Sequence, residues 1–162
     1  MKGDLVMAID ASGFKKAMGR WASGVTVVTA EHNGVRHGMT VSSFASVSLD
    51  PPLVLVCIGK AAPTHDIIKK GERFVVNVLA DSQETISLRF AMKHDDRFEG
   101  VALRPGQLGV PIIDGCLAAI ECRLHETLPG GDHTIYVGEV VNAEVAEGSP
   151  LLYFQGGHRK MV

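Results

Sequence analysis

Five hydroxyl side chains fall within a short stretch of the chain, between two runs of apolar, β-prone residues. They are Thr40, Ser42, Ser43, Ser46 and Ser48, in the segment GMTVSSFASVSLDPPLVLVCIG. A solvent-exposed turn is built from Gly, Asn or Asp, so a turn does not account for these hydroxyls. Hydroxyl groups suit a site that holds a polar ligand against an apolar wall. The segment therefore predicts a binding site.

The alternation of this segment predicts how its side chains are arranged. In an extended strand, Ser42, Ser46 and Ser48 would lie on one face together with Thr40. With the backbone N–H groups of the bend TVSS, these hydroxyls could surround a phosphate without a P-loop. The alternative, on the residues alone, is that the hydroxyls pair with one another across neighbouring strands.

His133 is the second candidate for chemistry. It follows Gly130, Gly131 and Asp132, which a hairpin turn explains without any further function. A hairpin does not require a histidine at the next position, where an apolar residue would serve equally well. An isolated histidine is more often a surface or structural residue than a catalytic one, so both interpretations of His133 remain open.

Common catalytic motifs are absent from the sequence. It contains no P-loop, no G-x-S-x-G, no H-E-x-x-H and no G-x-G-x-x-G between a strand and a helix. The seven histidines are scattered without the spacing of metal ligands, so no metal site is expected. Cys57, Cys116 and Cys122 form no C-x-x-C pair, and we expect them to be reduced thiols in a cytoplasmic protein.

Length and composition indicate an ordinary globular domain. The chain has 162 residues, of which 46% are hydrophobic and 21% charged, and its formal net charge is -2. This charge favours neither nucleic acid nor an anionic membrane as a partner. No apolar run approaches the roughly 20 residues of a membrane span, and the start MKGDLVMAID lacks the apolar segment of a secretory signal.

The elements that must position the candidate side chains are mostly strands. Apolar alternation and turn signals predict strands at 25–30, 37–42, 53–59, 73–79, 116–128, 133–147 and 149–159, the last as a single strand. Asn33-Gly34 predicts a tight hairpin between the first two, and PGGD at 129–132 predicts another between the two longest. The segment 53–59 is expected to be buried. Residues 92–115, rich in Gly, Pro and charge, predict a long loop.

Three short helices are expected at the edges. Asp10 and Ser12 can cap the first, which carries an apolar face of Phe14, Ala17, Met18 and Trp21 and ends at Gly24. Thr64 opens the second, which Gly71 stops. Asp81 and Glu84 stand at the spacing of a capping box before the third, at 84–91.

The order of elements favours a closed or nearly closed antiparallel barrel over a parallel α/β sheet. We expect a flexible segment at 1–12 and a single domain at 13–162. The many apolar strand faces exceed what three short helices can cover, which favours a homodimer with twofold symmetry.

Five segments carry a resemblance to a known family. They are GVTVVTA, GMTVSSFASVSLDPPLVLVCIGKAAPTHDII, RFVVNVL, GDHTIYVGEVV and SPLLYFQG, and their order and spacing resemble those of the flavin reductase-like family from about Phe14 to Arg159. Its members include the small reductase components of two-component flavin-dependent monooxygenases. The resemblance implies a mainly β fold: an antiparallel, Greek-key-like, FMN-binding split β-barrel with a few short peripheral helices. Two positions depart from the family pattern: Trp21 replaces a more usual Phe, and His158 a frequent Tyr.

The resemblance also implies a reaction, in which NADH or NADPH reduces FMN or FAD and the reduced flavin serves a separate oxygenase. Because a flavin carries this chemistry itself, the protein need only bind and orient it, which explains why no catalytic motif is found. Two alternatives remain: a split barrel like pyridoxamine-phosphate oxidase, which would oxidise an organic substrate, and a flavin-binding electron carrier without a pyridine-nucleotide site.

Individual site residues follow from the same resemblance. Thr40, Val41, Ser42 and Ser43 would hold the ribityl-phosphate end of the flavin, Ser46 and Ser48 would lie along the isoalloxazine, and the main chain of Cys57, Ile58 and Gly59 would meet its polar edge. Lys60 and Thr64 would bind phosphate, His133 beside Asp132 would face the nicotinamide, and Arg89, Phe90, Arg97, Phe98, Tyr153 and Arg159 would border the cofactor.

Overall fold

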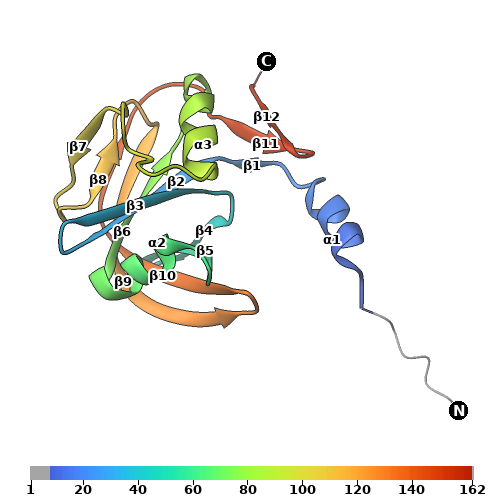
Figure 1. Ribbon diagram of the computed structural model, residues 1–162, viewed down its shortest axis with the longest axis horizontal. Helices are drawn as coiled ribbons and strands as arrows, with labels where there is room; N and C mark the ends of the chain where they lie inside the picture. Colours follow the sequence, from blue (N-terminus) through green and yellow to red (C-terminus); the bar gives the residue numbers. More distant parts are fainter. Residues whose placement is uncertain (1–7, 162) are drawn as a thin grey trace, which may run out of the picture.

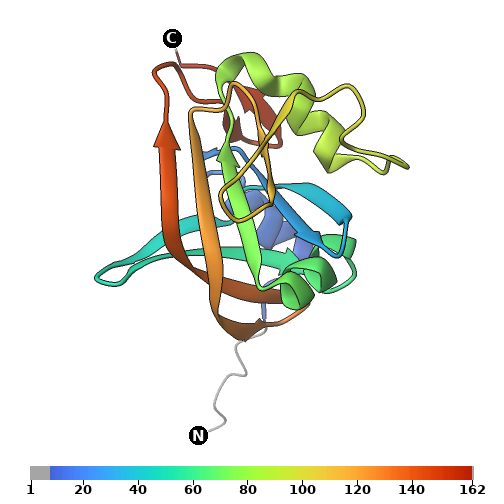
Figure 2. The same ribbon diagram turned by 90° about the vertical axis from the view of Figure 1, so that its left-hand side faces the viewer.

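A seven-stranded antiparallel sheet forms the centre of the computed structural model, which describes residues 8–161. Its strands lie in the order β3 (Val35–Val41), β2 (Thr26–His32), β6 (Arg73–Val78), β9 (Ala118–Gly130), β10 (His133–Val145), β5 (Pro52–Gly59) and β4 (Phe44–Leu49). The sheet curls on itself, but its edge strands β3 and β4 do not pair, so the barrel stays partly open (Figures 1 and 2). The expected split barrel, mainly β with a few peripheral helices, is confirmed.

Both predicted hairpins are present. Asn33 and Gly34, with φ of 51° and 81°, form the turn between β2 and β3, and such positive φ pairs match the twist of antiparallel strands. Residues 131–132 connect β9 to β10, the longest strands in the sheet. Because these turns need particular residue types, they were readable from the sequence.

Helix α2 (Pro63–Gly71) packs its Ile68 into the interior of the barrel, together with Val28, Phe74 and Tyr136. The helix ends one residue later than expected. Glu72, rather than Gly71, takes the left-handed conformation, with φ of 54°, and its N–H donates to Ile68 O.

Helix α3 (Glu84–Ala91) follows a short 3₁₀ turn, η1 (Asp81–Gln83), and packs Phe90 into a second apolar cluster with Val27 and Leu79. The expected capping box of Asp81 and Glu84 is wrong. Gln83 Oε1 instead accepts from Ala80 N at 3.0 Å, because the 3₁₀ turn brings that amide side chain, and not a carboxylate, to the free N–H.

Two segments contain more strands than expected. Residues 92–115 are not one loop, since β7 (Leu103–Pro105) and β8 (Pro111–Ile113) pair within them. The C-terminal segment is not one strand: Gln155 and Gly156, both with positive φ, turn β11 (Leu152–Phe154) back into β12 (Gly157–Arg159). β11 also pairs with β1 (Ser23–Gly24), which makes a small separate sheet.

The first helix, α1 (Ala11–Met18), stands off from the barrel (Figure 1). Its cap is as expected, since Asp10 Oδ1 accepts from Gly13 N, but it ends at Met18 rather than at Gly24. Its apolar face is not buried: Phe14, Met18 and Trp21 are 56%, 51% and 73% exposed. The helix begins inside the segment expected to be flexible at 1–12, of which residues 1–7 lie outside the described residues.

The hairpin of β4 and β5 also extends away from the barrel, as α1 does (Figure 2). At its tip Leu49 is 96% exposed, and Val47 is half exposed. Helix α1 and the β4–β5 hairpin therefore both expose apolar side chains to solvent. None of the helices in the described part of the chain has the length and apolar character needed to cross a bilayer.

A buried carboxylate fixes the loop before β8. Glu121 is fully buried, with Oε2 accepting from Leu108 N and Oε1 from Asn142 Nδ2, both at 2.9 Å. Burial alone would raise the pKa of Glu121, but these hydrogen bonds outweigh it and the pKa lies below the ordinary value. The ionised form is therefore the one that stabilises the fold.

We expect Glu121→Gln to lower the free energy of unfolding by about 1–2 kcal/mol at neutral pH, because one acceptor becomes an NH₂ that faces a donor. The folded-state pKa lies below the unfolded value, so this stabilisation is fully present above the unfolded pKa and is lost as the pH falls through the folded one. Urea unfolding at neutral and acidic pH measures it. The exposed Glu147→Gln is the control, and a difference that does not shrink in acid would contradict the assignment.

Candidate functional site

A cavity of about 680 Å³ lies between α1, the bend that joins β3 to β4, one face of β5 and the C-terminal hairpin. It is lined by Phe14, Lys15, Met18, Gly19, Trp21, Ser23, Ser42, Ser43, Phe44, Ala45, Leu55, Cys57, Tyr153, Gln155 and Gly156. This volume is within the roughly 300–1,000 Å³ that is usual for ligand sites. Four of the residues expected at the flavin, Ser42, Ser43, Cys57 and Tyr153, meet here.

Strand β5 divides its side chains between the core and this cavity. Val54, Val56 and Ile58 are buried in the barrel, whereas Leu55 and Cys57 are half-buried and line the cavity. The expectation of a fully buried strand is therefore wrong. Alternate side chains of a strand point to opposite faces, and only one face of β5 is covered by the barrel core.

The two serines of the bend differ in what they bind. Ser43 Oγ donates to Cys57 O and accepts from Cys57 N, both at 3.1 Å, which fastens the bend to β5. Ser42 is exposed, and its hydroxyl makes no hydrogen bond among the described residues. Ser42 is therefore the hydroxyl that a ligand can engage without breaking a bond within the protein.

The expected ladder of hydroxyls on one strand face is not formed. The bend at Ser42 and Ser43 separates β3 from β4, and a bulge between Ser46 and Ser48 breaks the alternation within β4. Thr40 Oγ1 donates to Ser87 O at 2.6 Å instead of lying beside the serines. The ladder fails because the chain changes direction where strict alternation would have to continue.

His133 lies on the same face of the sheet as Cys57. It pairs with Gly59, two residues along β5 from Cys57, and residues paired directly across strands share a face. A side chain at Gly59 would begin 3.7 Å from His133 Nε2, so the imidazole lies over this glycine. The register thus brings His133 and the serine bend to one surface.

The turn that carries His133 is tied to the end of β5. Lys60 N donates to Asp132 O at 3.0 Å, and Lys60 Nζ donates to Gly131 O at 2.7 Å. Asp132 Oδ1 lies 2.7 Å from His133 Nδ1, and this hydrogen bond lowers the pKa of Asp132. The carboxylate orients the ring so that Nε2 remains free to meet a ligand.

The other expected residues are engaged within the protein. Thr64 is fully buried, with its hydroxyl 2.6 Å from His37 Nδ1. Phe90 is fully buried, in an edge-to-face contact with Phe98. Hydrogen bonds also occupy Arg89, whose Nε donates to Arg97 O.

Three expected residues lie at the ends of strands or in the loop before β7. Arg97 Nη1 donates to Gly38 O at 2.8 Å, and Arg159 Nη1 donates to the carbonyl of its neighbour His158. Val41 is buried at the end of β3, so only its main chain is available to a ligand.

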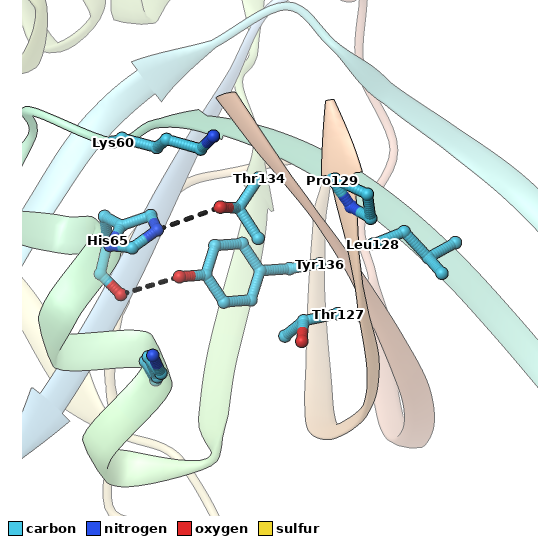
Figure 3. A pocket seen from close by; sticks show the side chains of 8 residues that line it. Lys60, His65, Thr127, Leu128, Pro129, Thr134 and Tyr136 are labelled. Carbon is cyan, nitrogen blue, oxygen red and sulfur yellow. Dashed lines mark hydrogen bonds between the residues drawn. The ribbon is translucent and has the colours of Figure 1, made fainter. Parts of the chain in front are cut away.

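A different cavity, of about 450 Å³, lies between α2 and the β9–β10 hairpin (Figure 3). His65 Nε2 lies 2.9 Å from Thr134 Oγ1, and Tyr136 OH donates to His65 O. Thr134 pairs with Ile58, so this cavity is on the opposite face of the sheet from Cys57. Lys60 reaches it, but the serine bend and His133 do not line it.

A third cavity, of about 520 Å³, adjoins the first. It is lined by Val25, Thr40, Ser42, Glu84, Ser87, Leu88, Ala91, Tyr153, Gly156, Gly157 and His158. The α3 residues of this cavity were not expected at the site, although their spacing at i, i+3, i+4 and i+7 marks one face of a helix. Helix α1 was also not expected as a wall of the first cavity, although Phe14, Met18 and Trp21 share its apolar face.

The first cavity fits a flavin. Trp21, Phe44 and Leu55 supply apolar surface for a ring system, and Ser42 offers a free hydroxyl for a polar tail. No group of three or more His, Cys, Asp or Glu side chains in residues 8–161 is arranged to hold a metal ion. The arrangement can therefore bind and orient a redox cofactor that brings its own chemistry.

Comparisons with known proteins show which family the chain resembles over nearly its whole length. Residues 18–161 match the model of the flavin reductase like domain. The chain is 43% identical over 150 residues to the reductase component of 4-hydroxyphenylacetate 3-monooxygenase from Thermus thermophilus, which covers 92% of this chain and 95% of that protein. It is 40% identical over 160 residues to the reductase component of a 4-nitrophenol monooxygenase from Rhodococcus opacus, covering 98% of this chain and 86% of that one.

A solved structure gives the same result for the fold. The NADH:FAD oxidoreductase of Streptomyces globisporus superimposes with a TM-score of 0.90 at 37% identity, covering 96% of this chain and 97% of that one. The domain match spans most of the chain, and the relatives match nearly their whole length. By its sequence and its fold, the chain belongs to the flavin reductase-like family.

Proposed function

We propose that the protein is an NAD(P)H:flavin oxidoreductase that supplies reduced flavin to a separate monooxygenase. One observation carries the proposal: the cavity at the Ser42–Ser43 bend and Cys57 lies on the face of the β5–β10 pair to which His133 also belongs, although about 90 residues separate the bend from His133. Relatives named as reductase components of monooxygenases support both the activity and the partner.

Each of these residues has a role in binding or orientation. Bound flavin supplies the chemistry by accepting a hydride from NADH or NADPH. Ser42 would hold the polar tail of the flavin, while Trp21 and Leu55 would offer apolar surface to its ring. His133 Nδ1 donates to Asp132 Oδ1, which leaves Nε2 as an acceptor that would receive a hydrogen bond from the NH₂ of the nicotinamide carboxamide and set its plane. Orientation of this kind raises the rate without a nucleophile or a metal.

One steady-state assay tests the proposal. Purified protein is given NADH or NADPH with riboflavin, FMN or FAD, and oxidation of the nucleotide is followed by its absorbance. We expect flavin-dependent oxidation, with release of reduced flavin that an added oxygenase can use. Protein that binds flavin but oxidises neither nucleotide would be an electron carrier, and oxidation of pyridoxamine phosphate instead would indicate the related oxidase.

The proposal includes a homodimer in the cytoplasm. The three free cysteines, Cys57, Cys116 and Cys122, are consistent with a reducing compartment. A second copy of the chain would cover the exposed apolar side chains of α1 and of the β4–β5 hairpin, and both flank the first cavity. Twofold symmetry is the commonest arrangement of a homodimer, and it brings the same surface of both copies together so that each covers the other.

We expect light scattering to give a mass twice that of the 17.3 kDa chain. Leu49→Asp should shift the protein towards monomer, because it places a charge at the exposed tip of the hairpin. Val35→Asp is the control, since Val35 is also exposed but begins β3, at the turn on the side of the barrel opposite α1 (Figure 1). A stable wild-type monomer at micromolar concentration would contradict the dimer.

A further inference from the structure

The cavity of about 450 Å³ between α2 and the β9–β10 hairpin has no part in the proposed function (Figure 3). It lies on the face of the sheet opposite Cys57, so the sheet separates it from the first cavity. Its volume is nevertheless within the range of small-molecule sites. It is therefore a candidate site for a second ligand.

The lining residues that carry a charge at neutral pH are two lysines, Lys60 and Lys69, and no carboxylate side chain lines the cavity. Lys69 lies in the last turn of α2 and makes no ion pair or side-chain hydrogen bond with any of residues 8–161. Lys60 Nζ donates to Gly131 O at 2.7 Å, which occupies one of the three donors of an ammonium group. Both lysines can therefore donate to an anion.

The polar side chains of the wall bind one another or the main chain. His65 Nδ1 donates to Asp66 Oδ1 at 2.9 Å, so Nε2 accepts from Thr134 Oγ1, also at 2.9 Å. Tyr136 OH donates to His65 O at 2.9 Å. These bonds fix the wall and leave the two ammonium groups as its free charged donors.

The rest of the cavity is apolar. Leu128, which is 40% exposed, and Pro129 line it from β9, and the ring of Tyr136 lies between them and α2 (Figure 3). A ligand that matches the whole cavity carries a negative charge near the lysines and an apolar body against these side chains. Inorganic phosphate supplies only the first feature, and a neutral aromatic molecule only the second.

The cavity is connected to the turn that carries His133. Lys60 holds this turn with two hydrogen bonds, from N to Asp132 O and from Nζ to Gly131 O. Thr134 follows His133 along β10, and its side chain points to the other face of the strand. An anion that draws Lys60 Nζ away from Gly131 O removes one of the two bonds, and the position of the His133 imidazole then becomes less fixed.

We infer that this cavity binds a small organic anion, a carboxylate with an apolar body, and that the bound anion slows hydride transfer by loosening the His133 turn. Binding of the anion is independent of the proposed function, whereas its effect on the rate rests on that function. Because the anion acts from the opposite face of the sheet, it does not compete with flavin.

Calorimetric titration of the protein, without flavin or NADH, tests the site with benzoate, benzamide and inorganic phosphate. Benzamide has the shape of benzoate without its charge, and phosphate lacks the apolar body, so each is expected to bind at least about tenfold more weakly than benzoate. Lys69→Gln should weaken benzoate roughly five- to tenfold. Lys70→Gln is the matched control: both residues are exposed lysines in the last turn of α2, but only Lys69 lines the cavity.

Stopped-flow reduction of the flavin-loaded protein by NADH measures the effect on the rate. Saturating benzoate should slow the wild type about two- to fivefold without changing the Kd of FMN, and the same concentration should slow Lys69→Gln less than Lys70→Gln. Equal affinities for benzoate and benzamide, equal affinities for benzoate in the two lysine variants, displacement of FMN or an unchanged rate would each overturn the inference. Protein that binds benzoate as expected, but is not reduced by NADH, would contradict the proposed function and leave the anion site standing.

Discussion

His133→Ala is expected to slow the reduction of bound flavin by NADH by roughly ten- to a hundredfold, with flavin affinity almost unchanged. His133 lies over Gly59, beside the cavity but not among its lining residues, so its removal leaves the flavin contacts in place. The lost contribution is the orientation of the nicotinamide, because Nε2 no longer meets the carboxamide. Stopped-flow absorbance under anaerobic conditions measures the rate directly.

The pH dependence separates orientation from acid–base catalysis. Hydride transfer requires no proton from the enzyme in the same step, so the pH profile of His133→Ala should change less than its rate. Asp132→Asn keeps the imidazole but removes the charge that orients it, and a smaller loss of rate is expected. The exposed His125→Ala is the control for loss of a histidine on the neighbouring strand. A wild-type rate in His133→Ala would make His133 an ordinary turn residue, and loss of flavin would move it to the flavin site.

The second large effect is expected at Ser42. Ser42→Ala should weaken flavin binding by roughly ten- to a hundredfold, since it removes a hydrogen bond to a charged phosphate, worth about 1.5–3 kcal/mol. The hydroxyl has no partner among the described residues, so its removal leaves no group of the protein unpaired. Fluorescence titration with FMN measures the affinity, and thermal unfolding without flavin should give wild-type stability.

Ser43→Ala provides the comparison, because the structure gives Ser43 a different role. Its Oγ binds both N and O of Cys57, so the substitution leaves the Cys57 amide unpaired and loosens the bend. We expect a loss of stability without flavin, by about 1–3 kcal/mol, and a loss of affinity that follows from it. Equal flavin affinity in Ser42→Ala and the wild type would contradict the assignment of the bend to the phosphate.

The sequence by itself determined much of the local structure and indicated a candidate site. Asn33-Gly34 and the Gly131 turn predicted both hairpins, since these turns need residues that tolerate positive φ. The hydroxyl-rich segment at 40–48 and His133 predicted a binding site, because neither a turn nor a hairpin requires these residue types. Signals of this kind act between residues that are near one another in the chain.

Only the tertiary structure decided which of these side chains are free to bind a ligand. Thr40 was expected to bind flavin, but folding brings Ser87 O to its hydroxyl, and Thr64 is buried against His37. The register of β10 on β5 places His133 over Gly59, and that register depends on how the whole sheet closes. The apolar face of α1 was predicted correctly. Whether that face is buried depends on contacts with segments that are distant in the sequence. Periodicity reports that a face is apolar, whereas the packing of distant segments determines what covers it.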